Sequence, residues 1–254
     1  MDAVPVDWLR TVYDEWGRGN FRAGADGLAP DFEFNTGSDF PDPERGVAAG
    51  QAVRDYWRGF LSSWAHLRIA ALEMTPVGDR VLILVRQTGT GRASGVETSL
   101  DYFHVWRFGD AGASRLDALL GAGEARVEQL RGLYDAWATG DFDVGEALFA
   151  PDIAFVTSEG FPDAPGPGTG LARVERWRDQ FLAAFEDLRI EALALEALGE
   201  RVLTRVRQTG RFRATGIEVD VIYFHLWSFR GGRAIRFQAF EPTAETEARA
   251  AACQ

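Results

Sequence analysis

The sequence has a single cysteine and no long apolar run. Because Cys253 is the last residue but one, the chain can form neither an internal disulfide nor a cysteine-based metal site. Its apolar runs fall short of the roughly 18–20 residues that a transmembrane helix needs. The N-terminal segment is acidic and lacks the apolar region of a signal peptide. These absences predict a soluble cytoplasmic protein.

Basic residues are outnumbered as well. The chain has 27 Lys and Arg against 38 Asp and Glu, a net charge of −11, and no basic stripe with interleaved aromatic residues. Nucleic acids and anionic membranes are themselves negative, so neither is expected as a partner. What the sequence does have is a hydrophobic share of 46% and eight tryptophans. This composition indicates a folded globular protein, long enough for two cores.

The sequence contains an internal duplication. "YFHVWRF" at 102–108 returns as "YFHLWSF" at 223–229, which is 121 residues later. The same spacing relates "GDRVLILVRQTG" at 78–89 to "GERVLTRVRQTG" at 199–210. Similarity at one fixed spacing marks tandem copies of a structural unit.

We therefore expect two domains, over 1–120 and 121–254. The register between the copies is ambiguous, by about one residue, only near 43–59. Apolar spacing predicts that each copy has three helices followed by long strands. The predicted elements of the first copy are a helix over 6–16, a short second helix, a loop over 36–50, a helix carrying Val53, Trp57, Phe60 and Trp64, and strands over 67–75, 80–92, 95–108 and 114–120. Val174, Trp177, Phe181 and Phe185 are the corresponding positions of the third helix in the second copy.

Helices followed by a run of strands indicate an α+β domain with an antiparallel sheet. The last strands are apolar on both faces, as "VIYFHLWSF" at 221–229 shows. An antiparallel sheet with one solvated face would alternate apolar and polar residues. We expect one face to pack on the domain's own helices and the other on the second copy. This gives a pseudo-dimer within the chain, either monomeric or in a further homodimer.

Several motifs recur in the same order in both copies. They are "APDFEF" at 29–34 with "APDIAF" at 150–155, the "VRQTG" phrases, and the "H-x-W-x-F" pattern that begins at His104 and His225. This order resembles the SnoaL-like branch of the nuclear transport factor 2-like superfamily, which includes ketosteroid isomerases and polyketide cyclases. The resemblance implies two tandem cone-shaped domains, each a curved antiparallel sheet wrapped on three helices around an apolar pocket.

The repeated histidines are the first candidates for chemistry. The resemblance places His104 and His225 where ketosteroid isomerases carry a pocket carboxylic acid that stabilises an enolate. An imidazole can donate a hydrogen bond to developing negative charge, or remove a proton. Alternatively, each histidine is a core residue satisfied by a tyrosine or a backbone group. One histidine per copy predicts no metal site, no cofactor motif is present, and His66 is expected to be solvated.

The general base of the related enzymes is missing from its usual place. Ketosteroid isomerases and polyether epoxide hydrolases carry a catalytic aspartate about five residues after the aspartate of "APD", where this chain has Thr36 and Thr157. Acids in the following loop are alternative bases, although an aspartate that caps a turn explains them equally well. These loop acids are Asp39, Asp42, Glu159 and Asp163.

Other acids differ between the copies. Glu241 ends the last strand and is expected to face the pocket, whereas Leu120 is its first-copy equivalent. Asp117 aligns with Gln238, and some SnoaL-type cyclases use an aspartate on this strand as acid or base. Glu191 aligns with an alanine. If any of these acids is catalytic, the two pockets are not equivalent.

Aromatic and amide side chains are the expected substrate contacts. The glutamines are predicted to point inward, the tryptophans of the histidine strand to lie near the pocket mouth, and the helix tyrosines near its floor. Those tyrosines are also plausible as core residues. The predicted substrate-binding residues are Tyr13, Tyr134, Thr36, Thr157, Trp57, Trp177, Gln87, Gln208, Tyr102, Tyr223, Trp106 and Trp227.

These features favour a cofactor-independent enzyme that isomerises or cyclises an apolar, carbonyl-bearing substrate of polyketide or terpenoid type by proton transfer. Three alternatives stay open. The chain is a non-catalytic carrier of an apolar ligand, an epoxide hydrolase or epoxide-opening cyclase with paired acids, or an interaction scaffold with an exposed apolar patch. The sequence predicts a small organic ligand as the partner in all but the last of these.

Overall fold

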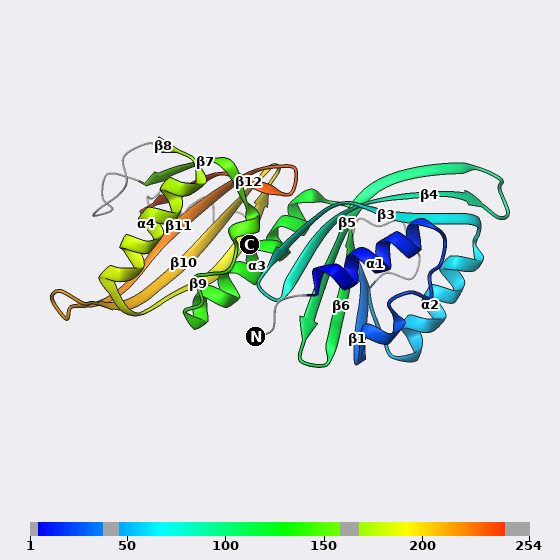
Figure 1. The fold of residues 1–254 in the computed structure, drawn as a ribbon, viewed down its shortest axis with the longest axis horizontal. Coiled ribbons are helices and arrows are strands. Elements are labelled where there is room, and N and C mark those ends of the chain that lie inside the picture. Colours follow the sequence, from blue (N-terminus) through cyan, green and yellow to red (C-terminus); the bar gives the residue numbers. More distant parts are fainter. Residues whose placement is uncertain (1–4, 38–45, 158–167, 242–254) are drawn as a thin grey trace. The chain divides into compact units, whose positions relative to one another are not determined.

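The computed structural model describes residues 5–37, 46–157 and 168–241. It divides into two compact units, Met1–Gln129 and Leu130–Gln254 (Figure 1). Each unit holds one copy of the duplicated sequence, and each is described by itself below.

The first unit places two helices against one six-stranded sheet. Its strand order is β2-β1-β6-β5-β4-β3. The elements are α1 (Val6–Gly17), the 3-10 helix η1 (Ala25–Gly27), β1 (Leu28–Thr36), β2 (Gly46–Ala49), α2 (Gln51–Ser62), β3 (Trp64–Val77), β4 (Arg80–Gly91), β5 (Glu97–Gly109) and β6 (Gly112–Leu119).

The second unit repeats this arrangement with the strand order β8-β7-β12-β11-β10-β9. Its elements are α3 (Ala122–Thr139), the 3-10 helix η2 (Glu146–Leu148), β7 (Phe149–Thr157), β8 (Gly168–Thr169), α4 (Leu171–Ala184), β9 (Phe185–Leu198), β10 (Arg201–Phe212), β11 (Glu218–Arg230) and β12 (Arg233–Phe240).

The predicted α+β class and its tandem arrangement are confirmed. The short second helix of each copy is a 3-10 turn. One neighbouring pair in each sheet is parallel, β1 with β6 and β7 with β12, while the other pairs are antiparallel. A parallel pair needs a long crossover connection. The helix α2 and the four strands β2, β3, β4 and β5 between β1 and β6 supply that connection.

Two details differ from the sequence prediction. Trp64 and Phe185 do not belong to the third helix, because each is the first residue of a strand. Trp64 pairs with Gly91, and Phe185 pairs with Phe212. The segment expected to be a loop over 36–50 includes the edge strand β2, which pairs with β1. In both places the hydrogen bonds of sheet pairing override local sequence pattern.

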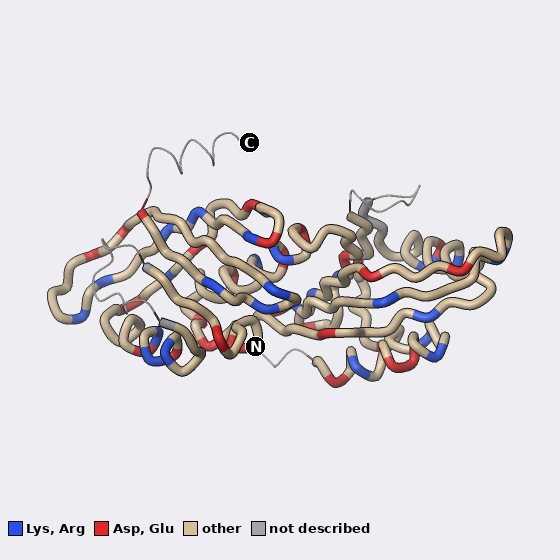
Figure 2. The backbone as a smooth tube through the Cα atoms, turned by 90° about the horizontal axis from the view of Figure 1, so that it is seen from above, with Lys and Arg blue, Asp and Glu red and all other residues tan. Residues whose placement is uncertain are grey.

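The core of each unit lies between its helices and the sheet. In α1 the buried side chains are Leu9, Val12, Tyr13 and Trp16, whose spacing gives the helix one apolar face. Charged residues of both signs are intermixed along the surface strands and helices (Figure 2). Two such pairs, Arg86 with Asp101 and Arg207 with Asp220, are exposed and bidentate.

Helix α3 begins in one unit and ends in the other. Ala125, in its first turn, is buried with Leu82, Val105 and Leu119 of the first unit. Glu128 forms an ion pair with Arg107 of that same unit. Later in the helix, Leu130, Leu133 and Tyr134 are buried within the second unit. The helix is continuous across the division.

Candidate ligand-binding site

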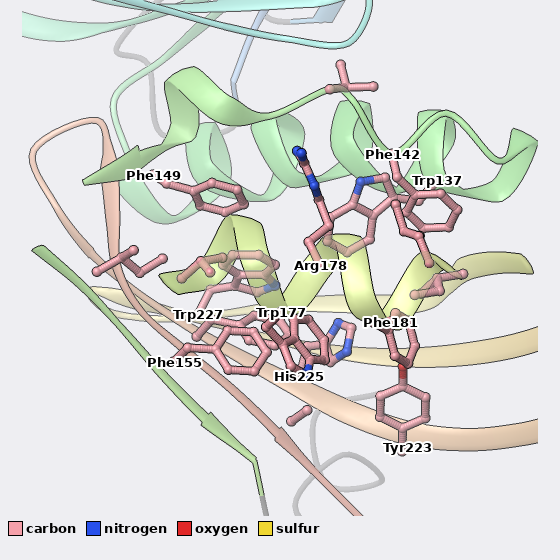
Figure 3. Close-up of a pocket in the computed structure, with 17 residues that line it drawn as sticks. Trp137, Phe142, Phe149, Phe155, Trp177, Arg178, Phe181, Tyr223, His225 and Trp227 are labelled. Atoms are coloured by element: carbon pink, nitrogen blue, oxygen red, sulfur yellow. The ribbon is translucent and has the colours of Figure 1, made fainter. Parts of the chain in front are cut away.

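A cavity of about 80 Å³ lies inside the second unit, between α3, α4 and the concave side of the sheet (Figure 3). Its walls are almost entirely apolar, as is usual for sites that take small organic molecules. The aromatic lining residues are Trp137, Phe142, Phe149, Phe155, Trp177, Phe181, Tyr223, Trp227 and Phe237. Aliphatic side chains complete the wall, namely Val144, Ile153, Val174, Leu182, Ile190 and Ala239.

Three polar side chains also reach this cavity: His225 and Tyr223 from β11, and Arg178 from α4. None of the described lining residues is a carboxylate. The described cavity therefore offers hydrogen-bond donors and one positive charge, without an acidic group to act as a base.

His225 is held by a buried hydrogen-bond chain. The Tyr134 hydroxyl lies 2.7 Å from Nδ1 of His225. The indole nitrogen of Trp227 donates to that same hydroxyl at 2.9 Å. The donor in the bond between this hydroxyl and Nδ1 depends on the histidine tautomer, and we take the tautomer in which the hydroxyl donates to Nδ1. The ring proton of a neutral His225 then resides on Nε2.

Burial decides the charge states of His225 and Tyr134. The environment of His225 disfavours a charged ring, so desolvation lowers the pKa of His225 to about 3. Desolvation likewise raises the pKa of Tyr134 well above its usual range. Both groups are therefore neutral near pH 7. Among the described residues the printed hydrogen bond of His225 is the one at Nδ1, so Nε2 is available at the cavity wall, where the indole N–H of Trp137 is also buried without a partner.

A second buried pair stands beside the first. The hydroxyl of Tyr223 donates to Oε1 of Gln208 at 2.9 Å. The ring of Tyr223 also lies edge-on to His225, with centroids 5.0 Å apart. Burial raises the pKa of the Tyr223 hydroxyl, which therefore stays protonated. Gln208 thus fixes the orientation of Tyr223 and does not itself line the cavity.

The first unit repeats these bonds. Tyr13 lies 2.6 Å from Nδ1 of His104, and Trp106 donates to Tyr13 at 2.8 Å. Tyr102 donates to Gln87 at 3.1 Å. Burial lowers the pKa of His104 to about 3, as it does for the second histidine.

The two units differ at one position of the third helix. The 121-residue spacing holds through this helix, so that Tyr56 corresponds to Trp177, and Trp57 corresponds to Arg178. The packing agrees. The ring centroids of Phe34 and Tyr56 lie 4.9 Å apart, and those of Phe155 and Trp177 lie 4.3 Å apart, with the rings tilted in both pairs. The predicted equivalence of Trp57 and Trp177 is therefore wrong by one residue.

Trp57 is part of a packed aromatic cluster in the first unit. Its ring centroid is 5.7 Å from Trp16, 5.3 Å from Phe34 and 5.7 Å from Phe60. The indole thus fills space next to the first helix, where the second unit has the cavity and a flexible arginine side chain. His104 lies next to this cluster, and its ring centroid is 6.4 Å from that of Trp16.

Asp117 is not a pocket residue. Along β6, Leu116 and Ala118 belong to the core beneath the helices, so Asp117 points to the opposite face. Its carboxylate there accepts hydrogen bonds from Arg115, at 2.8 Å, and from Asn35, at 2.7 Å. These bonds give the buried carboxylate a structural role, and the acid–base role stays a prediction.

Other predicted residues also lie elsewhere. Glu241 follows β12 and is exposed, outside the cavity lining, and Glu191 is exposed on β9. Trp106 and Trp227 are buried beside the histidines and not at a pocket mouth. Thr36 is buried at the end of β1, and its hydroxyl makes no hydrogen bond to a described residue.

Some predictions fall on parts that the structure does not describe. The loop acids Asp39, Asp42, Glu159 and Asp163 lie outside the described residues, as does the side chain of Thr157. His66 is exposed on β3. Among the described residues, no group of three or more His, Cys, Asp or Glu is placed to hold a metal ion. No helix in the described ranges has the length and apolar character to cross a membrane.

The fold is an α+β domain present in two copies, and the described apolar cavity lies in the second. The model of the SnoaL-like domain family matches residues 9–114 and again residues 130–237. These matches cover most of the chain, which therefore belongs to the SnoaL-like domain family, as the sequence motifs indicated. Comparison with curated protein sequences found no match.

Solved structures resemble one copy at a time. An NTF2-like protein from Burkholderia pseudomallei is 23% identical with a TM-score of 0.41, over 49% of this chain and 95% of its own. A putative SnoaL-like polyketide cyclase from Jannaschia sp. CCS1 is 20% identical with a TM-score of 0.39, over 49% and 89%. Bal32a, from a soil-derived mobile gene cassette, is 21% identical with a TM-score of 0.42, over 46% and 88%. Similarities at this level concern the fold alone.

Proposed function

We propose that the second unit binds a small apolar molecule that carries a carbonyl oxygen. The observation that carries the proposal is an aromatic cavity with donors in its wall: the buried, unpartnered indole N–H of Trp137, and Nε2 of His225, whose printed hydrogen bond is at Nδ1. A donor left without a partner in apolar surroundings costs free energy. A carbonyl oxygen satisfies this donor, and because the cavity of about 80 Å³ is smaller than most ligand sites, it must widen to take an apolar ring.

The Tyr134–Trp227 bonds prepare the His225 donor. They fix the orientation of the ring before any ligand arrives. A preorganised donor loses little conformational entropy when it binds an acceptor. The same arrangement favours a ketone, an aldehyde or a quinone over a hydrocarbon of the same shape.

A proton-transfer isomerase or cyclase is the second candidate, acting on a polyketide-like or terpenoid-like ketone. It is favoured by the same donor, because an enolate oxygen carries more negative charge than a ketone and binds a fixed N–H more strongly. Against it, the described lining holds no carboxylate, and a pKa of about 3 makes His225 a weak base. Ligand binding is therefore the function that the geometry supports best.

Binding can be tested with two probes of nearly the same shape, acetophenone and 2-phenylpropene, which differ by C=O against C=CH₂. We expect the wild-type protein to prefer acetophenone by up to about tenfold, the value of one net hydrogen bond. Isothermal titration calorimetry measures both affinities. His225→Phe should abolish the preference, whereas the matched variant His104→Phe should retain it. Equal preference in both variants, or failure of both probes to bind, contradicts the proposal.

Catalysis needs a separate measurement. In deuterated buffer, an enzyme that stabilises the enolate exchanges the methyl hydrogens of bound acetophenone, which proton NMR detects. Exchange that exceeds the buffer rate and disappears in His225→Phe supports the isomerase candidate. If acetophenone binds but its methyl hydrogens do not exchange, the isomerase candidate fails and ligand binding is the function that stands.

A further inference from the structure

The second unit carries a positive charge where the first carries an indole. Arg178 occupies the position on α4 that Trp57 occupies on α2, and it lines the cavity. The substitution therefore does two things at once. It leaves unfilled the space that a tryptophan fills in the first unit, and it adds a guanidinium to the lining.

The guanidinium lies at the far end of the cavity from the imidazole. In Figure 3 the Arg178 side chain leaves α4 and extends away from His225, toward the side where Phe149 and Trp137 are drawn. The side chain of Arg178 is 34% exposed, so its charged end is accessible while its stem covers apolar surface. Arg178 thus lines the cavity, and its guanidinium extends away from His225.

The existing partner of Arg178 holds it only weakly. Asp179, the next residue in the chain, accepts from Nε at 3.2 Å and from Nη2 at 3.1 Å, through the same carboxylate oxygen. The Asp179 side chain is 67% exposed. Exposed ion pairs contribute little net free energy, so a ligand anion in less polar surroundings can replace this contact.

From this arrangement we infer that the ligand of the second unit is an organic acid: an apolar ring with a carboxylate that pairs with Arg178. This inference rests on the proposed function, since the ring and the carbonyl occupy the same cavity. The planar guanidinium matches a carboxylate through two parallel hydrogen bonds. One cation in a lining without other charges suits a monoanion, and a phosphate dianion would leave a charge uncompensated.

The sharpest probe is a pair of compounds that differ by the carboxylate alone, 4-acetylbenzoate and acetophenone. For the wild-type protein at low ionic strength, we expect 4-acetylbenzoate to bind at least about tenfold more tightly, as a charge-assisted hydrogen bond implies. Raising the salt concentration should reduce this ratio of affinities. Titration calorimetry on the full chain measures both constants.

Variants of two neighbouring residues locate the effect. Arg178→Gln should bring the ratio of affinities close to one, and Arg178→Lys should restore part of it, because lysine keeps the charge but not the bidentate geometry. Asp179→Asn should raise the ratio, since it removes the competing carboxylate. Circular dichroism confirms that each variant is folded.

The outcomes separate the two proposals. A wild-type ratio near one, with acetophenone still bound, overturns the organic-acid inference and leaves the carbonyl site in place. In that case Arg178 only covers the apolar cavity with its stem. A high ratio that survives Arg178→Gln also overturns the inference. If neither compound binds, the proposed function itself fails.

Discussion

The Tyr134 hydroxyl lies 2.7 Å from Nδ1 of His225, and 121 residues earlier Tyr13 lies 2.6 Å from Nδ1 of His104. In each pair the histidine lies on one of the two middle strands of its sheet, β5 or β11. The tyrosine lies on the first helix of its unit, α1 or α3. The bond thus ties helix to sheet in both units, although only the second histidine lines the described cavity. The bond is structural in both units, and the ligand binding that we propose would use it only in the second.

Removing the tyrosine hydroxyl should therefore destabilise either unit. Tyr134→Phe leaves Nδ1 of His225 and the indole N–H of Trp227 without their partner. Buried polar groups that lose a partner cost about 1–3 kcal/mol. We expect a similar loss of unfolding free energy for Tyr13→Phe, measured by urea denaturation. Only Tyr134→Phe should also weaken acetophenone binding, and equal effects of the two variants on binding would contradict this assignment.

The buried histidines should make stability depend on pH. Their pKa is lowered to about 3 in the folded protein, from 6.5 in the unfolded chain. Between these values the unfolded state takes up a proton that the folded state does not. The stabilising contribution is thus fully present above pH 6.5 and decreases as the pH falls toward 3, by up to about 1.4 kcal/mol per pH unit for each histidine.

The measurement is the unfolding free energy between pH 6.5 and pH 5, where carboxylates remain mostly ionised. The double variant His104→Gln with His225→Gln should show a clearly shallower slope than the wild type over this interval. The exposed His66 stays in both proteins and serves as an internal control. Identical slopes would mean that the buried rings are protonated in the folded state.

Trp57 of the first unit and Arg178 of the second occupy the same helix position. Exchanging these two residues should exchange the binding properties of the units. Arg178→Trp should fill the cavity and abolish acetophenone binding. Trp57→Arg should open the first unit and raise the stoichiometry to two molecules per chain when the second unit is intact. Trp57→Arg should also cost stability, up to about 3 kcal/mol, because it removes a large aromatic ring from a packed cluster. Calorimetric stoichiometry is the test, and binding that survives Arg178→Trp unchanged would place the site elsewhere.

Asp117 provides a test of the opposite kind. Asp117→Asn weakens the bonds that its carboxylate accepts from Arg115 and Asn35 on the far face of the sheet. We expect a loss of about 1–3 kcal/mol in unfolding free energy. The affinity for acetophenone and any hydrogen exchange of its methyl group should not change. Unchanged stability of Asp117→Asn would contradict the structural role.

Much of the fold is readable from the sequence, because each unit is long, strongly periodic and present twice. The repeat fixes which residues correspond, and the alternation of β11 places Tyr223, His225 and Trp227 on one face. The sequence does not predict the short edge strands β2 and β8, because strand pairing creates them, and a four-residue or two-residue segment has no period to detect. Pairing of the two units through their sheets stays a prediction.

The site was harder to predict. Adjacent residues of α2, Tyr56 and Trp57, are both aromatic, so an alignment shifted by one residue still matched a tryptophan with Trp177. That shift concealed Arg178. Whether an aromatic ring lines a hollow or fills it depends on the packing of its neighbours, which the sequence pattern does not contain. The same is true of Asp117, whose orientation follows from the face of β6 that meets the helices.

Helix α3 has a consequence for how the duplicated protein can be divided. The first turn of α3 contributes Ala125 to the core of the first unit. Further along the same continuous helix, Tyr134 belongs to the core of the second unit. A fragment that stops at residue 120 would leave Leu82 and Val105 uncovered, and a fragment that starts at residue 130 would begin in the middle of a helix. A single cut therefore cannot leave α3 whole for both units.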